Sequence, residues 1–500
     1  MKSAPPRARR LWRGDLVGIL GAPALTAVAL TSPPSARWLI AMGIIAFIAF
    51  LALWRPAIGI AVFALYICAQ GFLRRVLPPT DLLAQLGDPL LFVSPAIAVV
   101  LALHRHFVVR RPYTRLERLV LVLQALLLVS ALNPLGGGPV ASLRQFLVVA
   151  LPMTWLYAAG SLGWWTPARF RGLLWGLVGL AAVSALYARY QVAFGFPSWD
   201  ERFIRESGLA SLDIGGFIRP FSSYTAASDY SGVLLLGTTA AIVLALSSGH
   251  PLVLRLIALV FAAGLFEQII LVGSRGPVVA VVAALTMCCL SAGGLKARYA
   301  YPLMVVAGAV ALRFTARLGT VAEATDTNSA AVARQIQGFQ DPFGEESTLP
   351  GHVARLVNGV TEALLNPVGS GVGSIGTAGG TETSYGDLGL ALGVLGLIAA
   401  FGFVALVAHT AFSRSAWPAG RWSDPRRLWL VSVVALPFGP LVTAGNYAQM
   451  ALFYLAVGAA LPAVLRAGPS SGDEDDDGPA ERAPESARPS TSSTLRGAAR

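Results

Sequence analysis

Residues 252–292 read LVLRLIALVFAAGLFEQIILVGSRGPVVAVVAALTMCCLSA, two apolar runs joined by a short polar turn. The runs, 252–272 and 277–292, are each about long enough to cross the roughly 30 Å hydrocarbon core of a bilayer as a helix. Backbone N–H and C=O groups find no water there, so a spanning segment satisfies them within a helix or a closed barrel. These runs are continuous and lack the alternating segments of about ten residues that barrels show. They therefore predict a pair of membrane helices.

Similar runs recur along most of the chain. Hydrophobic residues make up 55% and charged residues 13% of its 500 residues, and the mean hydropathy is +0.64. Soluble chains carry about 25% charged residues. We therefore predict an all-α polytopic membrane protein with about 12–14 transmembrane helices. The candidate spans are 16–31, 38–54, 56–72, 89–103, 118–132, 143–160, 172–190, 231–247, 252–272, 277–292, 299–315, 386–411, 427–443 and 447–465.

The net charge of +12 resides mostly in short loops between these runs. Membrane topology explains this distribution better than nucleic-acid binding, because Lys and Arg gather in cytoplasmic loops. With a cytoplasmic N-terminus, the basic loops 104–118, 166–171, 295–298 and 413–427 fall inside. The uncharged loops 133–139 and 443–446 fall outside. Arg74 and Arg75 are the exception, since they fall on the external side.

This topology divides the chain into five regions. They are a basic cytoplasmic N-terminus (1–15), helices 1–11 (16–315) with an external loop at 191–230, a large external loop (316–385), helices 12–14 (386–466) and a cytoplasmic tail (467–500). We expect the first helix to be uncleaved, because no small-residue cleavage site follows it. The large loop contains helix signals and predicts a folded cap. The tail is rich in Pro, Ser, Gly and charge, and we expect it to be disordered.

The three cysteines, Cys68, Cys288 and Cys289, lie inside apolar runs. Buried cysteine usually behaves as a small hydrophobic residue. Their spacing is neither that of a disulfide framework nor that of a metal site. The sequence therefore predicts no metal and no cofactor.

Polar residues gather at two external mouths of the predicted spans. Arg219 and Asp229 precede or begin the span at 231–247, within GGFIRPFSSYTAASDYSGVL (215–234). They mark either a substrate path or a snorkelling arginine and a helix cap. Arg275 lies in the short turn VGSRGPVV (272–279). An arginine beside a helix N-terminus is well placed to bind an anion, and the alternative is a solvated side chain in a capping turn.

The end of the large loop carries a third polar group, in HVARLVNGVTEALLNPVGSGVGS (352–374). His352 and Arg355 share one face of the predicted helix. The following turn, with Gly369, Gly371 and Gly373, allows backbone N–H groups to approach a phosphate, although no nucleotide P-loop pattern is present. The alternative is an interfacial helix whose charges face water.

Carboxylates come next, in GTETSYGDLGLALGVLGLIAAF (380–401). Glu382 and Tyr385 lie at the mouth of the span at 386–411, and Asp387 begins it. A carboxylate at this place acts as a base, binds a sugar hydroxyl or only favours the helix dipole.

Taken in order, these segments resemble the O-antigen ligase and O-antigen polymerase superfamily of bacterial envelope proteins. The resemblance covers about residues 215–400. It rests on IRPFSSYTAASDYSGVL, on GSRGPVVA as a Ser-Arg-Gly turn, on a large loop ending in Arg355 and PVGSGVGS, and on the G-x-x-G pattern of GVLGLI (393–398).

The resemblance implies a GT-C-like, metal-independent glycosyltransferase in the bacterial plasma membrane. Its substrate would be a glycan on undecaprenyl diphosphate, transferred at the outer face to a sugar hydroxyl, with membrane lipid and possible chain-length regulators as partners. Arg219, Arg275 and Arg355 would bind the diphosphate, because fixed guanidinium groups stabilise a leaving diphosphate. Asp229, Tyr385 and the three glycines would support them.

The catalytic residue departs from the ligase pattern. Ligases of the family carry a histidine where this chain has Glu382, so the arrangement resembles polymerase-like members more closely. Glu382 is the expected base or hydroxyl anchor, and His352, the single histidine of the large loop, is the second candidate. The alternative function is a transporter or flippase, for which the mid-span carboxylate Glu267 would serve as a proton relay.

Overall fold

The computed structural model describes residues 33–77, 88–162, 165–207, 213–214, 217–273, 275–292, 349–377, 384–413, 417, 423–435 and 447–461. Within these residues the chain is helical, with one short antiparallel pair of strands, β1 (Asp213–Ile214) and β2 (Phe217–Ile218). The first half contains α2 (Pro33–Trp54), α3 (Pro56–Val76), η3 (Pro89–Phe92), α4 (Val93–His104), η4 (Arg105–Val109), α5 (Arg115–Ser130), η5 (Pro134–Gly136), α6 (Pro139–Gln145), η6 (Phe146–Ala150), η7 (Leu151–Met153), α7 (Thr154–Ser161), α8 (Pro167–Phe194) and α9 (Ser198–Ser207). The second half contains α10 (Ala227–Leu246), α11 (Leu252–Leu271), α12 (Arg275–Ala292), α15 (Leu349–Leu365), α16 (Ser374–Thr377), α17 (Ser384–Leu392), α18 (Val394–Phe412), α19 (Pro425–Ala435) and α20 (Tyr447–Ala460).

Eight helical stretches of the described residues are long and apolar enough to cross a membrane. They are Arg37–Trp54, Pro56–Val76, Pro89–Val109, Pro139–Gly160, Pro167–Phe194, Ala227–Leu246, Leu252–Leu271 and Val394–Phe412. Two shorter apolar helices, Gly276–Cys289 and Met450–Ala460, accompany them. The prediction of a polytopic α-helical membrane protein is confirmed. The expected spans 16–31 and 299–315 lie outside the described residues, so the total of about 12–14 stays a prediction.

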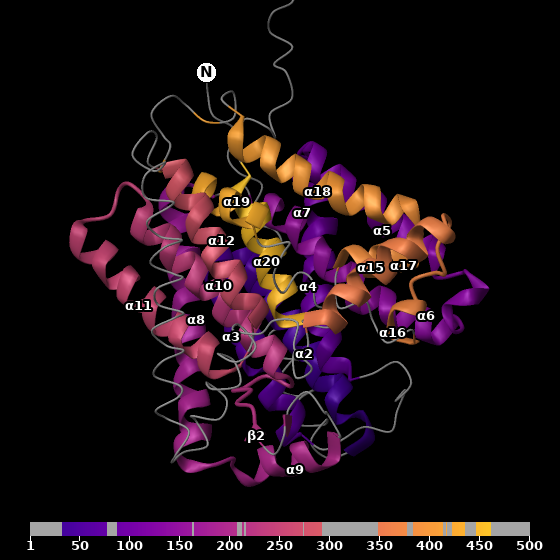
Figure 1. Cartoon of the computed structure of the whole chain (residues 1–500), viewed down its shortest axis with the longest axis horizontal. Helices are drawn as coiled ribbons and strands as arrows, with labels where there is room; N and C mark the ends of the chain where they lie inside the picture. Colours follow the sequence, from indigo (N-terminus) through magenta and orange to yellow (C-terminus); the bar gives the residue numbers. More distant parts are fainter. Residues whose placement is uncertain are drawn as a thin grey trace, which may run out of the picture.

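Helix α10 lies at the centre of the molecule, where it packs against α8, α11 and α12 (Figure 1). In the most apolar 18-residue window of α10, 89% of the residues are buried inside the protein. The corresponding share for α11 is 28%. Small residues bring the helices close together: a Cβ added at Gly237 would lie 2.3 Å from the Ala181 Cβ of α8. Close backbone approach of this kind is the usual means of packing helices in lipid, where burial of apolar surface gives little net stabilisation. The outer face of α11 is apolar as well, as expected for a helix that faces hydrocarbon.

The expected single span at 386–411 is wrong, because the structure breaks it into α17 and α18 at Gly393. Gly393 has φ 61° and ψ −138°, which ends α17 and redirects the chain. A Cβ at this position would lie 2.1 Å from the Pro367 carbonyl oxygen, so the backbone of the glycine-rich turn occupies the space that a side chain would need. The G-x-x-G pattern therefore marks a helix break and not a continuous helix.

Loops at one end of the bundle contact each other through charged side chains. Asp88 Oδ2 accepts hydrogen bonds from Arg37 Nη1 at 2.6 Å and from Arg74 Nε at 2.9 Å. Arg75 Nη1 donates to Asp200 Oδ1 of α9 at 2.6 Å. Arg74 and Arg75 were the exceptions to the positive-inside rule. Each has a carboxylate partner at its own end of the bundle, which gives a physical reason for its position there.

The loops at the other end form a separate group of contacts. Ser248 N donates to Ser423 O at 3.1 Å, and Arg427 Nη1 donates to Ser291 Oγ at 2.7 Å. Figure 1 shows α9 and β2 at the bottom of the bundle and α19 near its top. Helices α8, α10, α11 and α12 run alternately between the two groups. Which group faces the cell exterior stays a prediction.

Candidate functional site

Arg219 follows β2 and is held against the turn that ends α11. Its Nε donates to the Val272 carbonyl oxygen at 2.8 Å. The side chain is partly buried, and burial lowers the pKa of Arg219 to about 10. A group with that pKa remains charged at neutral pH. The guanidinium therefore brings a positive charge to the turn between α11 and α12.

Arg275 is the first residue of α12, three positions after Val272. Gly273 makes this connection tight: it has φ 74°, and its N–H donates to the Ile270 carbonyl at 3.0 Å. The structure thus brings together two segments that the sequence separates by about fifty residues, and both carry a predicted diphosphate-binding arginine. The Arg275 side chain lies outside the described part, so its direction stays a prediction.

The third arginine, Arg355, and the candidate His352 both lie on α15. Their side chains are outside the described residues, as is the whole of Glu382. Helix α15 packs against α17, where Gly389 allows contact with Ala363 and with the Gly359 carbonyl. In Figure 1 these helices lie together with α5, α6 and α18 on one side of the molecule. The catalytic roles of Glu382 and His352 stay predictions.

The glycine-rich turn after α15 approaches protein backbone closely. Gly369 N–H donates to the Asn366 carbonyl and Gly371 N–H to the Ala391 carbonyl, at 2.9 and 3.1 Å. A Cβ at Gly373 would lie 1.9 Å from the Gly136 carbonyl oxygen. The turn is therefore clamped between η5 and the end of α17. The N–H groups of Gly369 and Gly371 already have protein acceptors, and the expected supporting role of the turn toward a phosphate stays a prediction.

Tyr385 is the second residue of α17 and contributes to the lining of an apolar pocket. Its ring stacks on Phe401 of α18, with the ring centroids 5.3 Å apart. The pocket continues between α5, α18, α19 and α20, and its lining includes Leu123, Phe403 and Tyr454. Asp387, two residues further along α17, is buried. The apolar surroundings suit a hydrocarbon chain better than a charged group.

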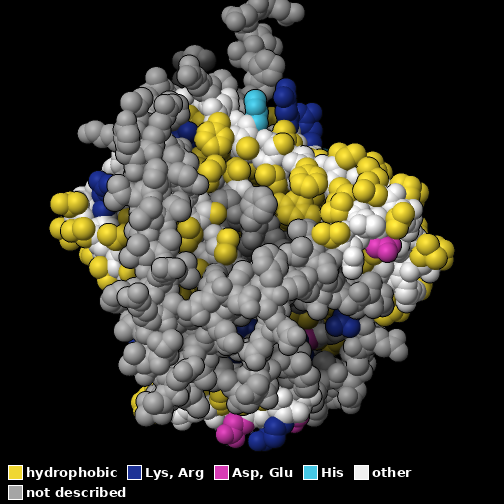
Figure 2. All heavy atoms as spheres, viewed as in Figure 1, with side chains coloured by type: hydrophobic (Ala, Val, Ile, Leu, Met, Phe, Trp, Pro, Cys, Tyr) yellow, Lys and Arg dark blue, Asp and Glu magenta, His cyan; other side chains and the backbone are white. Residues whose placement is uncertain are grey.

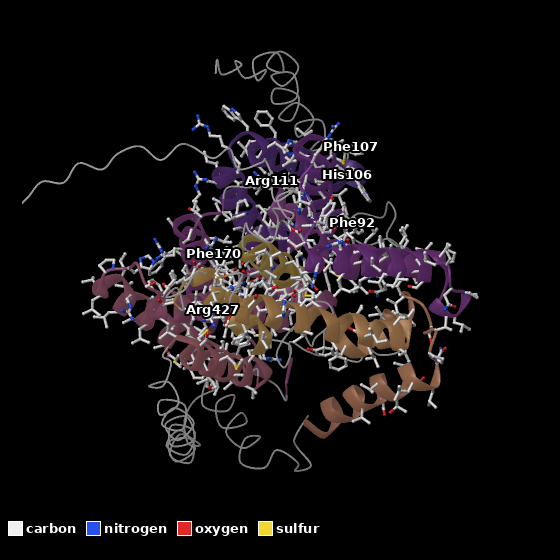
Figure 3. The ribbon with its side chains drawn as sticks, turned by 90° about the horizontal axis from the view of Figure 1, so that it is seen from above. Phe92, His106, Phe107, Arg111, Phe170 and Arg427 are labelled. Atoms are coloured by element: carbon white, nitrogen blue, oxygen red, sulfur yellow. The ribbon has the colours of Figure 1, made fainter. Side chains whose placement is uncertain are left out.

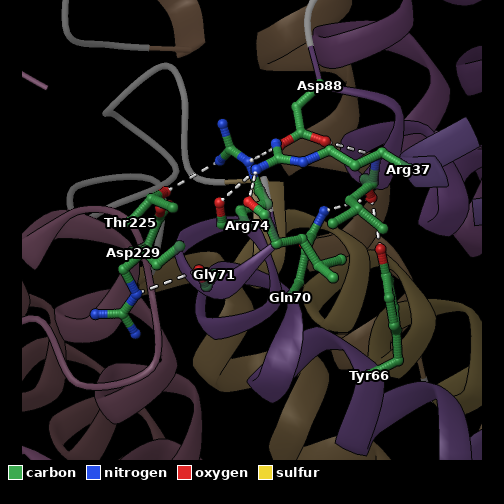
Figure 4. Close-up of polar contacts among 11 residues, drawn as sticks. Arg37, Tyr66, Gln70, Gly71, Arg74, Asp88, Thr225 and Asp229 are labelled. Carbon is green, nitrogen blue, oxygen red and sulfur yellow. Dashed lines mark hydrogen bonds and ion pairs between the residues drawn. The ribbon is translucent and has the colours of Figure 1, made fainter. Parts of the chain in front are cut away.

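Asp229 lies in the first turn of α10 and is 6% exposed. Its Oδ2 accepts from Thr225 Oγ1 at 3.4 Å, whereas its Oδ1 is buried with no hydrogen-bond partner. Arg74 Nη1 also reaches Thr225 Oγ1, at 3.4 Å, so Asp229 and Arg74 face the same cleft (Figure 4). A buried carboxylate oxygen without a protein partner is costly, so Oδ1 is the polar atom of this cleft that the described side chains leave unsatisfied.

A second buried pair connects α3 to α9 beside this cleft. Both side chains of the Arg75–Asp200 pair are 0% exposed. Asp200 Oδ2 also accepts from Tyr187 Oη at 3.0 Å and from Gln191 Nε2 at 2.8 Å, while Arg75 Nη2 donates to the Ser222 carbonyl at 3.0 Å. This network fixes the segment that leads into α10. Asp88 and Asp200 were not among the predicted site residues, and the external Arg74–Arg75 pair is the signal that points to them.

At the opposite end, the basic loop after α4 is held by another buried ion pair. Arg105 Nη1 donates to Glu117 Oε1 at 2.7 Å, and Glu117 also forms a capping box with Thr114 at the start of α5. His106, Phe107 and Arg111 are exposed, and Figure 3 labels them beside this loop. One carboxylate thus both caps a helix and neutralises a buried arginine.

Glu267, on which the transporter alternative rests, pairs with an arginine. Arg189 Nη2 of α8 donates to Glu267 Oε1 at 2.9 Å, and the two side chains are 54% and 57% exposed. The pair lies on the surface between α8 and α11. A proton relay needs a carboxylate that lines an internal path, and this placement does not favour that role.

Within the described residues, no group of three or more His, Cys, Asp and Glu side chains is arranged to hold a metal ion.

Space-filling atoms show an extensive apolar surface on the face drawn in Figure 2, in keeping with a membrane protein. The fold defines the class as a multi-pass α-helical membrane protein. No known family model matches the chain, and no curated protein sequence matches it significantly.

Proposed function

We propose that the protein is a membrane glycosyltransferase of the O-antigen polymerase or ligase type. It would transfer a glycan from undecaprenyl diphosphate to a sugar hydroxyl at the outer face of the bacterial plasma membrane. The observation that carries the proposal is the hydrogen bond from Arg219 to the Val272 carbonyl. It places the first of the three arginines beside the turn from which α12 and Arg275 begin.

The chemistry of glycan transfer from a lipid diphosphate explains the need for these arginines. When the bond between the sugar and the diphosphate breaks, negative charge develops on the leaving diphosphate. Fixed guanidinium groups stabilise such charge and bind phosphate oxygens with two parallel hydrogen bonds. A lysine in the same place acts as a point charge without that geometry, so we expect arginine to be required.

Complementation of a deletion strain tests this proposal. Loss of the gene should remove a surface polysaccharide, and the wild-type chain should restore it. Arg275→Ala and Arg355→Ala should each lower the restored amount by about a hundredfold, the range measured when one charge-stabilising donor is removed from an active site. Glu382→Ala should lower it similarly if this carboxylate is the base. The readout is surface polysaccharide on gels at matched protein levels.

Arg111→Ala is the matched control, because Arg111 is exposed at the other end of the bundle. It should restore polysaccharide as well as the wild type does. Full restoration by Arg275→Ala, Arg355→Ala and Glu382→Ala together, at normal expression, would rule out the glycosyltransferase.

A further inference from the structure

An open groove runs between α8 and α11 on the surface of the bundle. Its cavity volume is about 570 Å³, which lies within the range of about 300–1,000 Å³ that ligand sites commonly have. On α11 the lining is apolar from Val253 to Leu265. Arg189, Glu267 and Gln268 lie together at one end. The groove therefore has an apolar body and a polar end.

Helix α10 creates this groove, because it packs against α8 and α11 at once and holds them beside each other. Figure 1 shows α11 at the left edge of the bundle, with α10 and α8 next to it. Leu186 on the α8 wall and Val260 on the α11 wall are both exposed. In a membrane, apolar side chains exposed on the outside of the bundle face hydrocarbon. The body of the groove is therefore open to lipid.

The ends of the two helices place the polar end of the groove near the membrane interface. Arg189 lies five residues before the end of α8 at Phe194, and Glu267 lies four residues before the end of α11 at Leu271. Both are thus about 6–8 Å from a helix end. Tyr190 is exposed beside Arg189, and its ring lies 5.2 Å from that of Phe194. Tyrosine gathers at the level of lipid headgroups, so the polar end lies at that level.

The buried amide of Gln268 holds Arg189 in position at this end. With the amide oriented to suit its neighbours, the Gln268 oxygen accepts from Arg189 Nε at 2.8 Å and from Nη2 at 2.9 Å. Arg189 Nη2 also donates to Glu267 Oε1 at 2.9 Å. Arg189 Nη1 and Glu267 Oε2 have no hydrogen-bond partner among the described residues. A donor and an acceptor of opposite charge therefore remain side by side.

These two free groups match a headgroup that carries both charges. The oxygens of a phosphate diester accept hydrogen bonds from an arginine. A primary ammonium has N–H donors and no acceptor, so it suits the free carboxylate oxygen of Glu267. A trimethylated nitrogen has no N–H to donate, and a headgroup with negative charge alone leaves Glu267 without a partner. The polar end therefore favours a phosphate and a primary ammonium on one headgroup.

We propose that this groove binds phosphatidylethanolamine from the surrounding bilayer. Arg189 Nη1 donates to its phosphate, Glu267 Oε2 accepts from its ammonium, and one acyl chain lies between α8 and α11. From Val253 to Glu267 the groove follows α11 for roughly 20 Å, at about 1.5 Å per residue. One leaflet of the hydrocarbon core is about 15 Å thick, so the groove covers the whole depth of an acyl chain. The inference rests neither on glycan transfer nor on which end of the bundle is external.

Titration of the full-length protein in detergent, followed by native mass spectrometry, tests the proposal. The probes are phosphatidylethanolamine, phosphatidylcholine and phosphatidylglycerol with the same acyl chains. The Kd for phosphatidylethanolamine should be at least about tenfold lower than for the other two, as expected for a hydrogen bond between charged groups. Glu267→Gln should abolish the preference over phosphatidylcholine, because the carboxylate that receives the ammonium is gone. Arg189→Gln should weaken binding of both lipids, because both present a phosphate.

Glu201→Gln is the matched control. Glu201 pairs with Arg205 on α9 at the same end of the bundle, and both side chains are exposed outside the groove lining. The control should keep the preference for phosphatidylethanolamine. Exposed ion pairs contribute little to stability, so all three variants should fold.

Three results would overturn the proposal: equal affinity for the three lipids, tighter binding of phosphatidylglycerol, or a preference that persists in Glu267→Gln. The headgroup without acyl chains, glycerophosphoethanolamine, tests the apolar body separately. It should not compete with the lipid at equal concentration, since most of the contact lies along the acyl chain. Full competition would show that the groove itself contributes nothing, and would overturn the proposal as well.

Discussion

Gly393 shows how one residue decides the course of the chain. The sequence around it, LALGVLGLIAAF, is apolar throughout and reads as one helix. Its positive φ of 61° is accessible to glycine and strained for other residues. The Pro367 carbonyl then occupies the place of the missing side chain. A contact between residues 26 positions apart therefore fixes a break that local propensity does not predict.

Gly393→Ala should lower the free energy of unfolding by about 3 kcal/mol, because backbone strain adds to a steric clash. Thermal unfolding in detergent, followed by fluorescence, measures the loss. Gly264→Ala is the control: Gly264 lies within α11, and a Cβ there meets nothing within 4 Å. That change should be neutral or stabilise by up to about 1 kcal/mol. Equal stability of the two variants would show that the break does not depend on Gly393.

Among the elements, α9 depends on a buried ion pair for its attachment. The helix itself is short and strongly polar, and an isolated helix of this length is unstable in water. Asp200 fixes it to α3 through Arg75 and to α8 through Tyr187 and Gln191. The segment that carries Arg219 and leads to Asp229 follows α9, so this attachment also positions the candidate site.

A double-mutant cycle tests the attachment. Arg75→Met and Asp200→Leu should each cost about 3–5 kcal/mol, because each leaves its partner charged and buried. The double variant should lose at least about 1 kcal/mol less than the sum of the single losses. The exposed pair Arg205–Glu201, 3.8 Å apart, is the comparison and should couple by less than about 1 kcal/mol. Additive losses at Arg75 and Asp200 would contradict the pairing.

At the scale of the whole molecule, loop contacts form two separate groups, and helices α8, α10, α11 and α12 alternate between them. One group contains α9 and the Asp88 cluster, and the other contains Ser248 and Ser423. The positive-inside rule assigns the second group to the cytoplasm. This assignment would place Arg219, the start of α12 and the Asp229 cleft at the outer surface.

Cysteine labelling tests this orientation in intact cells, in a background without Cys68, Cys288 and Cys289. A membrane-impermeant maleimide should label Glu201→Cys and Leu135→Cys directly, because both residues are exposed and predicted to be external. Ser248→Cys and Arg111→Cys should react only after permeabilisation. The reverse pattern would place the cleft in the cytoplasm and exclude an enzyme that acts at the outer face.

The sequence predicts the membrane helices well, because each apolar run carries the signal of its own environment. Seven of the eight membrane-length stretches match single expected spans closely, and the eighth, Val394–Phe412, is the longer part of the broken span. The candidate site is harder to predict. Arg219 was identified from its place at a helix mouth, whereas Asp88 and Asp200 were missed, because nothing local shows which arginine each carboxylate pairs with.

The sequence by itself determined the class of protein, since apolar runs of membrane length and basic short loops reflect the bilayer and need no knowledge of neighbours. Only the tertiary structure decided where α17 ends, which charges are paired and which acid retains an unpartnered oxygen. Those properties depend on contacts between distant segments: Gly393 with Pro367, Arg75 with Asp200, and α3 with the residues before α10. Partners of this kind are set by packing geometry, which local sequence patterns do not encode.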